Sequence, residues 1–119
     1  MKILIVDDNQ SVASVVRSML EIEGHVVRLA LNGPDGYIAY VQFQPDLVIT
    51  DIQMPGENGF ELINHIRTLD PSVKAIYMSA NLNQFYSLLL EEKNKFPLQF
   101  IEKPFTMGEL IDRVSELTG

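Results

Sequence analysis

Short apolar runs alternate along this chain with longer stretches in which apolar residues recur every three or four positions. The short runs have the length of strands, and the longer stretches have the periodicity of amphipathic helices. Such alternation predicts βαβ units, whose right-handed crossovers bury a parallel sheet between two layers of helices. We therefore expect a single doubly wound α/β domain built from five βα units.

The five expected strands are short and mostly apolar, and cover residues 2–6, 25–30, 46–51, 73–78 and 98–101. Helical periodicity predicts the helices that follow them, at 12–20, 35–43, 60–69, 84–93 and 107–117. Asn9 and Thr106 are residue types that cap helix N-termini, while Gly24 and the Asp70-Pro71 pair mark helix ends. In the third helix we expect Phe60, Ile63, Ile66 and Leu69 to face the core.

Residues 81–97 carry the poorest helical pattern of the chain. Three consecutive leucines at 88–90 cannot all face one side of a helix, and Asn94 and Pro97 end the segment early. Gly36 also weakens the second helix, by about 1 kcal/mol relative to alanine. We expect the segment 81–97 to open locally at low free energy.

Composition limits the classes of function that remain. The chain has 119 residues, of which 46% are apolar, which is enough for one compact domain and excludes wholesale disorder. A formal charge of −7 would repel the phosphates of nucleic acid and the head groups of an anionic membrane, so we expect this domain to bind neither directly. The absence of cysteine excludes disulfides and thiolate metal sites, and suits a cytoplasmic location.

Polar side chains follow four of the expected strands. Asp7 and Asp8 come after the first, Asp51 ends the third, Ser79 follows the fourth and Lys103 follows the fifth. The carboxyl ends of parallel strands meet at one edge of a sheet, so these side chains should lie together. Three carboxylates 4 to 5 Å apart repel by roughly 4 kcal/mol per pair, which predicts a cation among them. Oxygen ligands without Cys or His favour Mg²⁺ over Ca²⁺ at a site that keeps water.

Four motifs in this order resemble the receiver domain of two-component response regulators. They are Ile3-Leu4-Ile5-Val6-Asp7-Asp8-Asn9, the run from Asp46 to Asp51 with Ile52-Gln53-Met54-Pro55-Gly56 after it, Ser79-Ala80, and Lys103-Pro104-Phe105. The resemblance covers essentially the whole chain, so residues 1–119 are expected to be one receiver domain. It also implies a flavodoxin-like parallel sheet of order 2-1-3-4-5 and a cis peptide between Lys103 and Pro104.

The resemblance implies a role for each residue of the constellation. Asp51 would accept a phosphoryl group from a phosphohistidine and, with Mg²⁺, form an acyl phosphate. The implied metal ligands are the side chains of Asp8 and Asp51, the backbone carbonyl of Gln53, and Asp7 through water. Ser79 would hydrogen-bond the phosphoryl group and Lys103 would pair with it. The domain would be a phosphoacceptor with at most weak self-dephosphorylation, not an enzyme in the usual sense.

The resemblance further implies an output surface and partners. Phe100 stands at the position of an aromatic switch residue that turns inward when the serine moves toward the phosphate. The implied upstream partner is a sensor histidine kinase or a phosphotransfer protein. The downstream partner is an effector protein or domain that reads the surface of the fourth helix, fifth strand and fifth helix, through which a homodimer is also possible.

Three other functions compete with this interpretation. A pseudo-receiver would keep the fold as a docking scaffold that needs no phosphorylation, although such modules commonly lose one of the site residues, and none is missing here. A phosphatase with an aspartate nucleophile usually has a second acid two residues later, where this chain has Gln53. A flavin carrier is disfavoured because no phosphate-binding loop follows the first strand.

Overall fold

The computed structural model describes residues 1–119, in which strands and helices alternate. In chain order the elements are β1 (Lys2–Val6), α1 (Gln10–Ile22), β2 (Val26–Ala30), α2 (Gly33–Phe43), β3 (Leu47–Asp51), α3 (Gly59–Arg67), β4 (Ala75–Ser79), the 3₁₀ helix η1 (Leu82–Phe85), α4 (Tyr86–Lys93), β5 (Leu98–Glu102) and α5 (Met107–Thr118). No helix is both long and apolar enough to cross a membrane.

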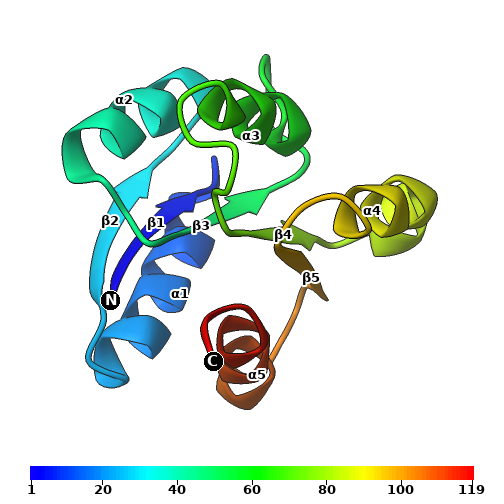
Figure 1. Cartoon of the computed structure of the whole chain (residues 1–119). Coiled ribbons are helices and arrows are strands. Elements are labelled where there is room, and N and C mark those ends of the chain that lie inside the picture. The colour runs from blue at the N-terminus through cyan, green and yellow to red at the C-terminus, as the bar shows by residue number, and fades with distance from the viewer.

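The strands form one parallel sheet in the order β2-β1-β3-β4-β5. This order confirms the expected flavodoxin-like, doubly wound fold. Helices α2, α3 and α4 cover one face of the sheet, and α1 and α5 cover the other (Figure 1). The three central strands therefore have helices on both faces, which explains why they are almost wholly apolar.

The sheet separates two hydrophobic cores. Successive side chains of a strand point to opposite faces, so Leu4 and Val6 join a cluster of 17 buried residues with α2, α3 and α4. Ile3 and Ile5 join a second cluster, of 12 buried residues, with α1 and α5. Each strand thus contributes side chains to both cores.

Four helices begin with a polar cap. The side chains of Asn9 and Asn32 accept hydrogen bonds from backbone N–H groups of the first turns of α1 and α2. Asn58 and Thr106 form reciprocal capping boxes with Glu61 and Glu109 at the starts of α3 and α5. These caps fix where the chain turns from strand to helix, and all four lie at the carboxyl edge of the sheet.

The expected third helix ends earlier than its apolar pattern predicts. Thr68 caps α3 after Arg67, and the backbone N–H groups of Leu69 and Asp70 both donate to the Ile66 carbonyl. The chain therefore turns away before Leu69, whose side chain is 55% exposed. The prediction that Leu69 faces the core is wrong, because local capping at Thr68 ends the helix before the apolar pattern does.

The poor helical pattern of 81–97 corresponds to a divided segment. A single 3₁₀ turn, η1, precedes the eight-residue α4, and Leu89 is the only buried residue of α4. Neither start has a side-chain cap. Gly36, by contrast, has a packing reason: a Cβ there would lie 3.0 Å from Val6 Cγ2 and 3.2 Å from Leu62 Cδ2, so α2 packs closely against its neighbours at this position.

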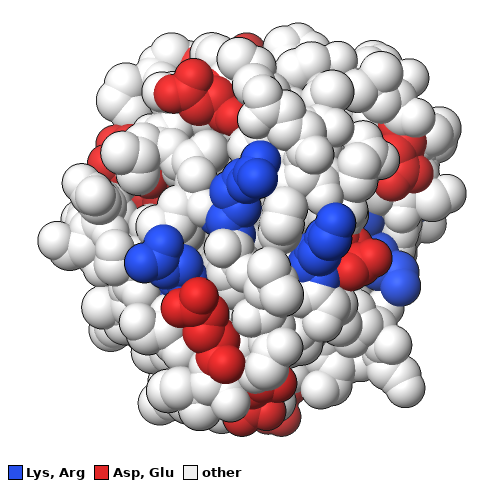
Figure 2. Space-filling view, turned by 90° about the vertical axis from the view of Figure 1, so that its left-hand side faces the viewer, with Lys and Arg blue, Asp and Glu red and all other residues white.

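The β2 edge of the sheet carries cations held over one aromatic ring. Lys2 Nζ and the Arg28 guanidinium lie 5.3 and 4.8 Å from the centre of the Phe43 ring. Figure 2 shows this side of the molecule, where basic and acidic side chains are interspersed on an otherwise uncharged surface. Charged residues at an edge strand disfavour strand pairing with another chain.

Candidate functional site

The carboxyl edge of the sheet brings together the polar residues predicted from the strand ends. Asp7 directly follows β1, Asp51 is the last residue of β3 and Ser79 is the last residue of β4. Carboxylate oxygens of Asp7, Asp8 and Asp51 lie within 4.8 Å of one another. Lys103, which follows β5, points its ammonium group at two of these carboxylates.

Asp7 is the most deeply buried charge of the group, with no exposed surface. One of its oxygens accepts a hydrogen bond from the backbone N–H of Asn9 at 2.9 Å, and the other accepts one from Lys103 Nζ at 2.7 Å. Lys103 Nζ lies 3.4 Å from Asp51 Oδ1. A buried carboxylate needs such compensation, so Lys103 holds Asp7 and Asp51 near each other.

Burial raises the pKa of the Asp51 carboxyl to about 6. Lys103 opposes this rise by Coulomb attraction, whereas the charges of Asp7 and Asp8 add to it. Asp51 is therefore a desolvated carboxylate that is still mostly ionised at neutral pH. A carboxylate freed from water and held among other charges has the properties of a nucleophile.

The three carboxylates fit a hard divalent cation. Together they carry three negative charges against the one positive charge of Lys103, and they offer oxygen ligands alone. Asp8 is exposed, so a cation bound there would keep water molecules, as Mg²⁺ usually does. Gln53 lies in the loop directly after β3 with its side chain exposed.

The loop from β3 to α3 is held tightly against Asp51. The backbone N–H of Gly59 donates to the Ile52 carbonyl at 2.9 Å, and the Thr50 hydroxyl donates to the Asp51 carbonyl at 3.0 Å. A Cβ on Gly59 would collide with the Asp51 carbonyl oxygen. Gly56 has a φ of 76°, which side-chain-bearing residues rarely adopt.

Ser79 is almost fully buried and is fixed by two backbone interactions. Its hydroxyl oxygen accepts a hydrogen bond from the N–H of Asn81 at 3.0 Å, and its carbonyl accepts one from the N–H of Lys103 at 2.9 Å. The second bond links the end of β4 to the residue that carries the ammonium group. The peptide between Lys103 and Pro104 is cis.

Phe100 lies apart from the carboxylates, on β5. Its half-buried ring meets Tyr86 of α4 edge to face, with ring centres 6.1 Å apart, and Lys93 Nζ lies 5.4 Å from its centre. The structure therefore places Phe100 against α4 instead of at the site. β5 connects Phe100 directly to Lys103, which follows the strand.

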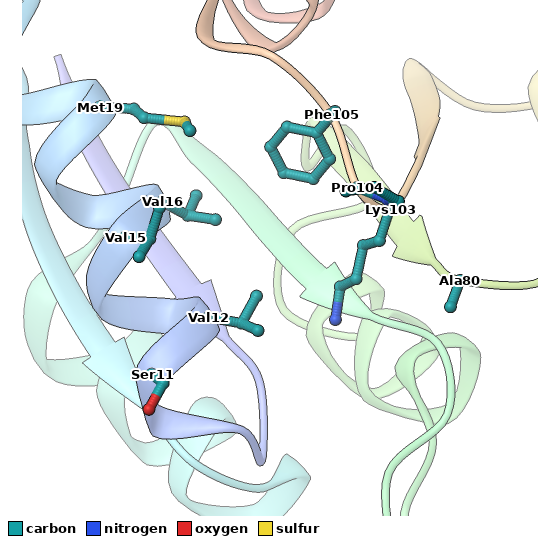
Figure 3. Close-up of a pocket in the computed structure, with 9 residues that line it drawn as sticks. All are labelled: Ser11, Val12, Val15, Val16, Met19, Ala80, Lys103, Pro104 and Phe105. Carbon is teal, nitrogen blue, oxygen red and sulfur yellow. The ribbon is translucent and has the colours of Figure 1, made fainter.

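An apolar hollow of about 480 Å³ adjoins Lys103. Figure 3 shows valine and methionine side chains of α1 on one side of it and the segment from Lys103 to Phe105 on the other. Val15, which the helical pattern places among the apolar residues of α1, is 55% exposed here. An apolar, solvent-exposed surface therefore lies directly beside the charged site.

The sequence pattern did not reveal a buried ion pair that joins α3 to α4. Arg67 Nη1 lies 3.0 Å from Glu92 Oε2, and both side chains are largely buried. The two residues are 25 positions apart in the sequence, and neither stands in a motif. Only the tertiary structure brings the ends of α3 and α4 together, so no local signal predicts the pair.

Comparison with known proteins gives a consistent result. The family model for the response regulator receiver domain matches residues 3–115. The sporulation initiation phosphotransferase F of Bacillus subtilis is 30% identical over 115 residues, which make up 97% of this chain and 91% of that protein. The transcriptional regulator NtrC of Azospirillum brasilense is 34% identical over 112 residues, but the chain spans only 23% of its length.

Solved structures agree with the sequence comparisons. The receiver domain of the hybrid histidine kinase CckA superposes with a TM-score of 0.81 at 26% identity, over all of both chains. The chemotaxis protein CheY4 of Vibrio cholerae has the same fold, with a TM-score of 0.88 over 98% of this chain and 97% of its own, at 23% identity. This chain belongs to the family of response regulator receiver domains, which are phosphorylation-regulated signalling switches and not classical enzymes.

Proposed function

We propose that residues 1–119 form one receiver domain in which Asp51 accepts a phosphoryl group from a phosphohistidine. The donor would be a cytoplasmic sensor histidine kinase or a phosphotransfer protein, and the phosphorylated domain would control an effector. The observation that carries this proposal is the contact of the Lys103 ammonium with both Asp7 and Asp51, at 2.7 and 3.4 Å. In this arrangement the Lys103 ammonium and the carboxylates of Asp7 and Asp8 lie around the desolvated Asp51 carboxylate.

The chemistry assigns each group a separate task. An oxygen of the Asp51 carboxylate attacks phosphorus, the P–N bond of the phosphohistidine breaks, and the leaving imidazole nitrogen keeps the electron pair and takes up a proton. Lys103 then pairs with a phosphoryl oxygen and offsets the transferred charge. The Ser79 hydroxyl, which accepts a bond from Asn81 in the unmodified protein, still has its own proton to donate to the phosphoryl group.

The same residues would hold Mg²⁺. The proposed ligands are the side chains of Asp8 and Asp51 and the backbone carbonyl of Gln53, with Asp7 bound through water. When bound, the ion would neutralise charge on the transferring phosphoryl oxygens. Two properties of the three carboxylates support this assignment: they offer oxygen ligands alone, and their negative charge is only partly compensated.

We propose that the donor protein binds at the apolar hollow beside Lys103. A donor must bring its phosphohistidine to Asp51 past the exposed surface, and the hollow lies on the Lys103 side of the site. Val15 and Met19 of α1, with Phe105, offer it uncharged contact area. Burial of such area would contribute affinity without adding charge next to the acidic site.

The proposed output is a change in the surface formed by α4, β5 and α5. Phosphorylation would draw Ser79 toward the phosphoryl group, and the Phe100 ring would then turn inward from its resting contact with Tyr86 of α4. An effector, or a second copy of the domain, would read this surface, and the domain itself would bind no nucleic acid. Any loss of the phosphoryl group by self-dephosphorylation would be slow.

The second candidate is a pseudo-receiver that docks a partner without phosphorylation. Against it stands the complete set of acceptor, neighbouring acids, serine and lysine at one edge of the sheet. A docking scaffold gains nothing from three carboxylates that repel one another, since their repulsion lowers stability.

Labelling with acetyl phosphate distinguishes the two candidates. With Mg²⁺ present, intact-mass spectrometry should show one phosphoryl group on the wild type and none on Asp51→Asn, whereas chelation of Mg²⁺ should abolish labelling. Asp112→Asn, which alters an exposed carboxylate of α5, is the control and should be labelled normally. Unchanged labelling of Asp51→Asn contradicts the acceptor assignment, and an unlabelled wild type favours the pseudo-receiver.

A further inference from the structure

A buried polar cluster lies between α3, β4 and α4, away from the carboxylates. The Arg67 guanidinium bonds to Glu92 at 3.0 Å, stacks on the Phe96 ring with its carbon 3.6 Å from the ring centre, and donates to Asn64. Side-chain exposure is 8% for Arg67 and 14% for Glu92. The cluster therefore joins the end of α3 to α4 and to the segment that leads into β5.

Besides this cluster, α4 is held by Leu89 in the core and by contacts of Tyr86 and Lys93 with β5. Leu89 is its only buried residue, its first turn has no side-chain cap, and its apolar residues do not form a single face. Leu88 and Leu90 are each 41% exposed. Because Leu89 is the one buried side chain of this eight-residue helix, the largely buried ion pair contributes a substantial share of its attachment.

The cluster is only partly satisfied. Nε and Nη2 of Arg67 and the hydroxyl of Tyr77, on β4, are buried without a hydrogen-bond partner. Tyr77 itself has no exposed surface. A buried donor without a partner raises the free energy of the arrangement that contains it. A displacement of α4 that lets these atoms form hydrogen bonds would therefore remove this contribution to the free energy.

We propose that the Arg67–Glu92 pair is a latch that holds α4 in its resting position, and that α4 has a second position in which the latch is open. In the open position the Arg67 guanidinium, which already lies beside the Tyr77 hydroxyl, is free to bond water, so the loss of one ion pair is partly offset. Energetic balance of this kind is what allows a small change elsewhere to move a helix.

Hydrogen exchange of the unphosphorylated protein tests the latch directly. In Glu92→Gln, amides of residues 86–97 should exchange at least about tenfold faster than in the wild type, since removal of one partner of a buried pair is costly. Peptides of α1 and β1 should stay within about twofold. The matched control is Glu91→Gln, which breaks the exposed pair with Lys95 and should leave α4 unchanged.

Two outcomes of this experiment overturn the proposal. If α4 exchanges at the wild-type rate in Glu92→Gln, the pair does not hold the helix. If all elements exchange faster to the same degree, the pair is a general contributor to stability and not a latch.

A double variant, Arg67→Met with Glu92→Leu, tests the switching role and rests on the proposed function. An apolar pair of similar volume keeps α4 attached but removes the opening. Beryllofluoride with Mg²⁺, which stands in for the phosphoryl group, should then change exchange of the peptide around Asp51 as in the wild type but change residues 86–97 much less. A full α4 response in the double variant overturns the latch. No response around Asp51 in the wild type would instead contradict the proposed function.

Discussion

The Lys103 ammonium donates to Asp7, at 2.7 Å, and not primarily to the proposed acceptor. In the unmodified protein its charge therefore compensates the one carboxylate that has no exposed surface. A phosphoryl group on Asp51 would bring further negative oxygens within reach of the same ammonium. The Lys103 ammonium would then interact with both Asp7 and the phosphoryl group. Any resulting shift of the Lys103 backbone would be transmitted to Ser79, whose carbonyl accepts the Lys103 N–H.

Replacement of Lys103 by alanine should leave the protein folded but less stable. Asp7 would lose its partner in a buried setting, so the free energy of unfolding in urea should fall by about 1 to 3 kcal/mol. Phosphorylation of Asp51 would still be possible, but NMR shifts around Phe100 on addition of beryllofluoride should be much smaller than in the wild type.

The control for this variant is Lys95→Ala, which removes an exposed ion pair with Glu91. Its stability should stay within about 0.5 kcal/mol of the wild type, and its beryllofluoride response should be normal. Wild-type shifts around Phe100 in Lys103→Ala would show that the ammonium does not couple the site to β5.

Asp51→Asn should stabilise the metal-free protein in a pH-dependent way. Burial raises the Asp51 pKa to about 6, so folding favours the neutral carboxyl, and the stability gained from it is present near pH 4 and lost as the pH rises through 6. Asparagine stays neutral throughout. With a chelator present, the variant should match the wild type near pH 4 and exceed it by about 1 to 3 kcal/mol near pH 8.

Urea unfolding across this pH range measures the difference, with Asp112→Asn as the exposed control. A gain for Asp51→Asn that is the same at both ends of the range would mean that the titration of Asp51 does not cause it.

Mg²⁺ should stabilise the wild type more than Asp8→Asn. A ligand that binds only the folded state adds about 2.7 kcal/mol when its concentration is a hundred times its Kd. Removal of one carboxylate weakens binding, so the rise in melting temperature with Mg²⁺ should shrink in Asp8→Asn. Asp35→Asn, which changes an acid in the first turn of α2, should keep the full rise. Equal rises in all three proteins would show that Asp8 is not a ligand.

Gly59→Ala should damage the site and the fold together. The new Cβ collides with the Asp51 carbonyl oxygen, so the loop after β3 has to shift, which should cost about 2 kcal/mol or more. Labelling by acetyl phosphate should slow as well. Gly108→Ala is the control, because a Cβ there meets only Thr106 Oγ1, at 3.8 Å, and alanine should favour α5 slightly. Normal labelling of Gly59→Ala would show that this close approach does not position Asp51.

The convergence of the carboxylates could be predicted because it follows from local patterns, whereas the strand order was implied by the resemblance to receiver domains. Each apolar run ends in the polar residue that the parallel topology then carries to one edge, so Asp7 and Asp51 could be placed together without knowledge of side-chain contacts. The direct bond from Lys103 to Asp7 was not predictable. It depends on rotamers in a shared buried space, which a strand pattern does not encode.

Errors and omissions occurred where neither the apolar period nor a motif marks the observed structure. Leu69 fits the apolar stripe of α3, yet the helix ends at Arg67, two residues earlier. The weak pattern of 81–97 was correctly identified, but not its division into η1 and α4. The Arg67–Glu92 pair joins residues that no sequence period relates.

Because the sheet stands between two cores, the two sides of this domain can be altered separately. The apolar hollow at α1 lies on the side of the 12-residue cluster, while α4 lies on the side of the 17-residue cluster. Substitutions that share no contacts have additive effects on stability. Substitutions that line the hollow and substitutions on α4 should therefore change the free energy of unfolding independently, because the strands separate them.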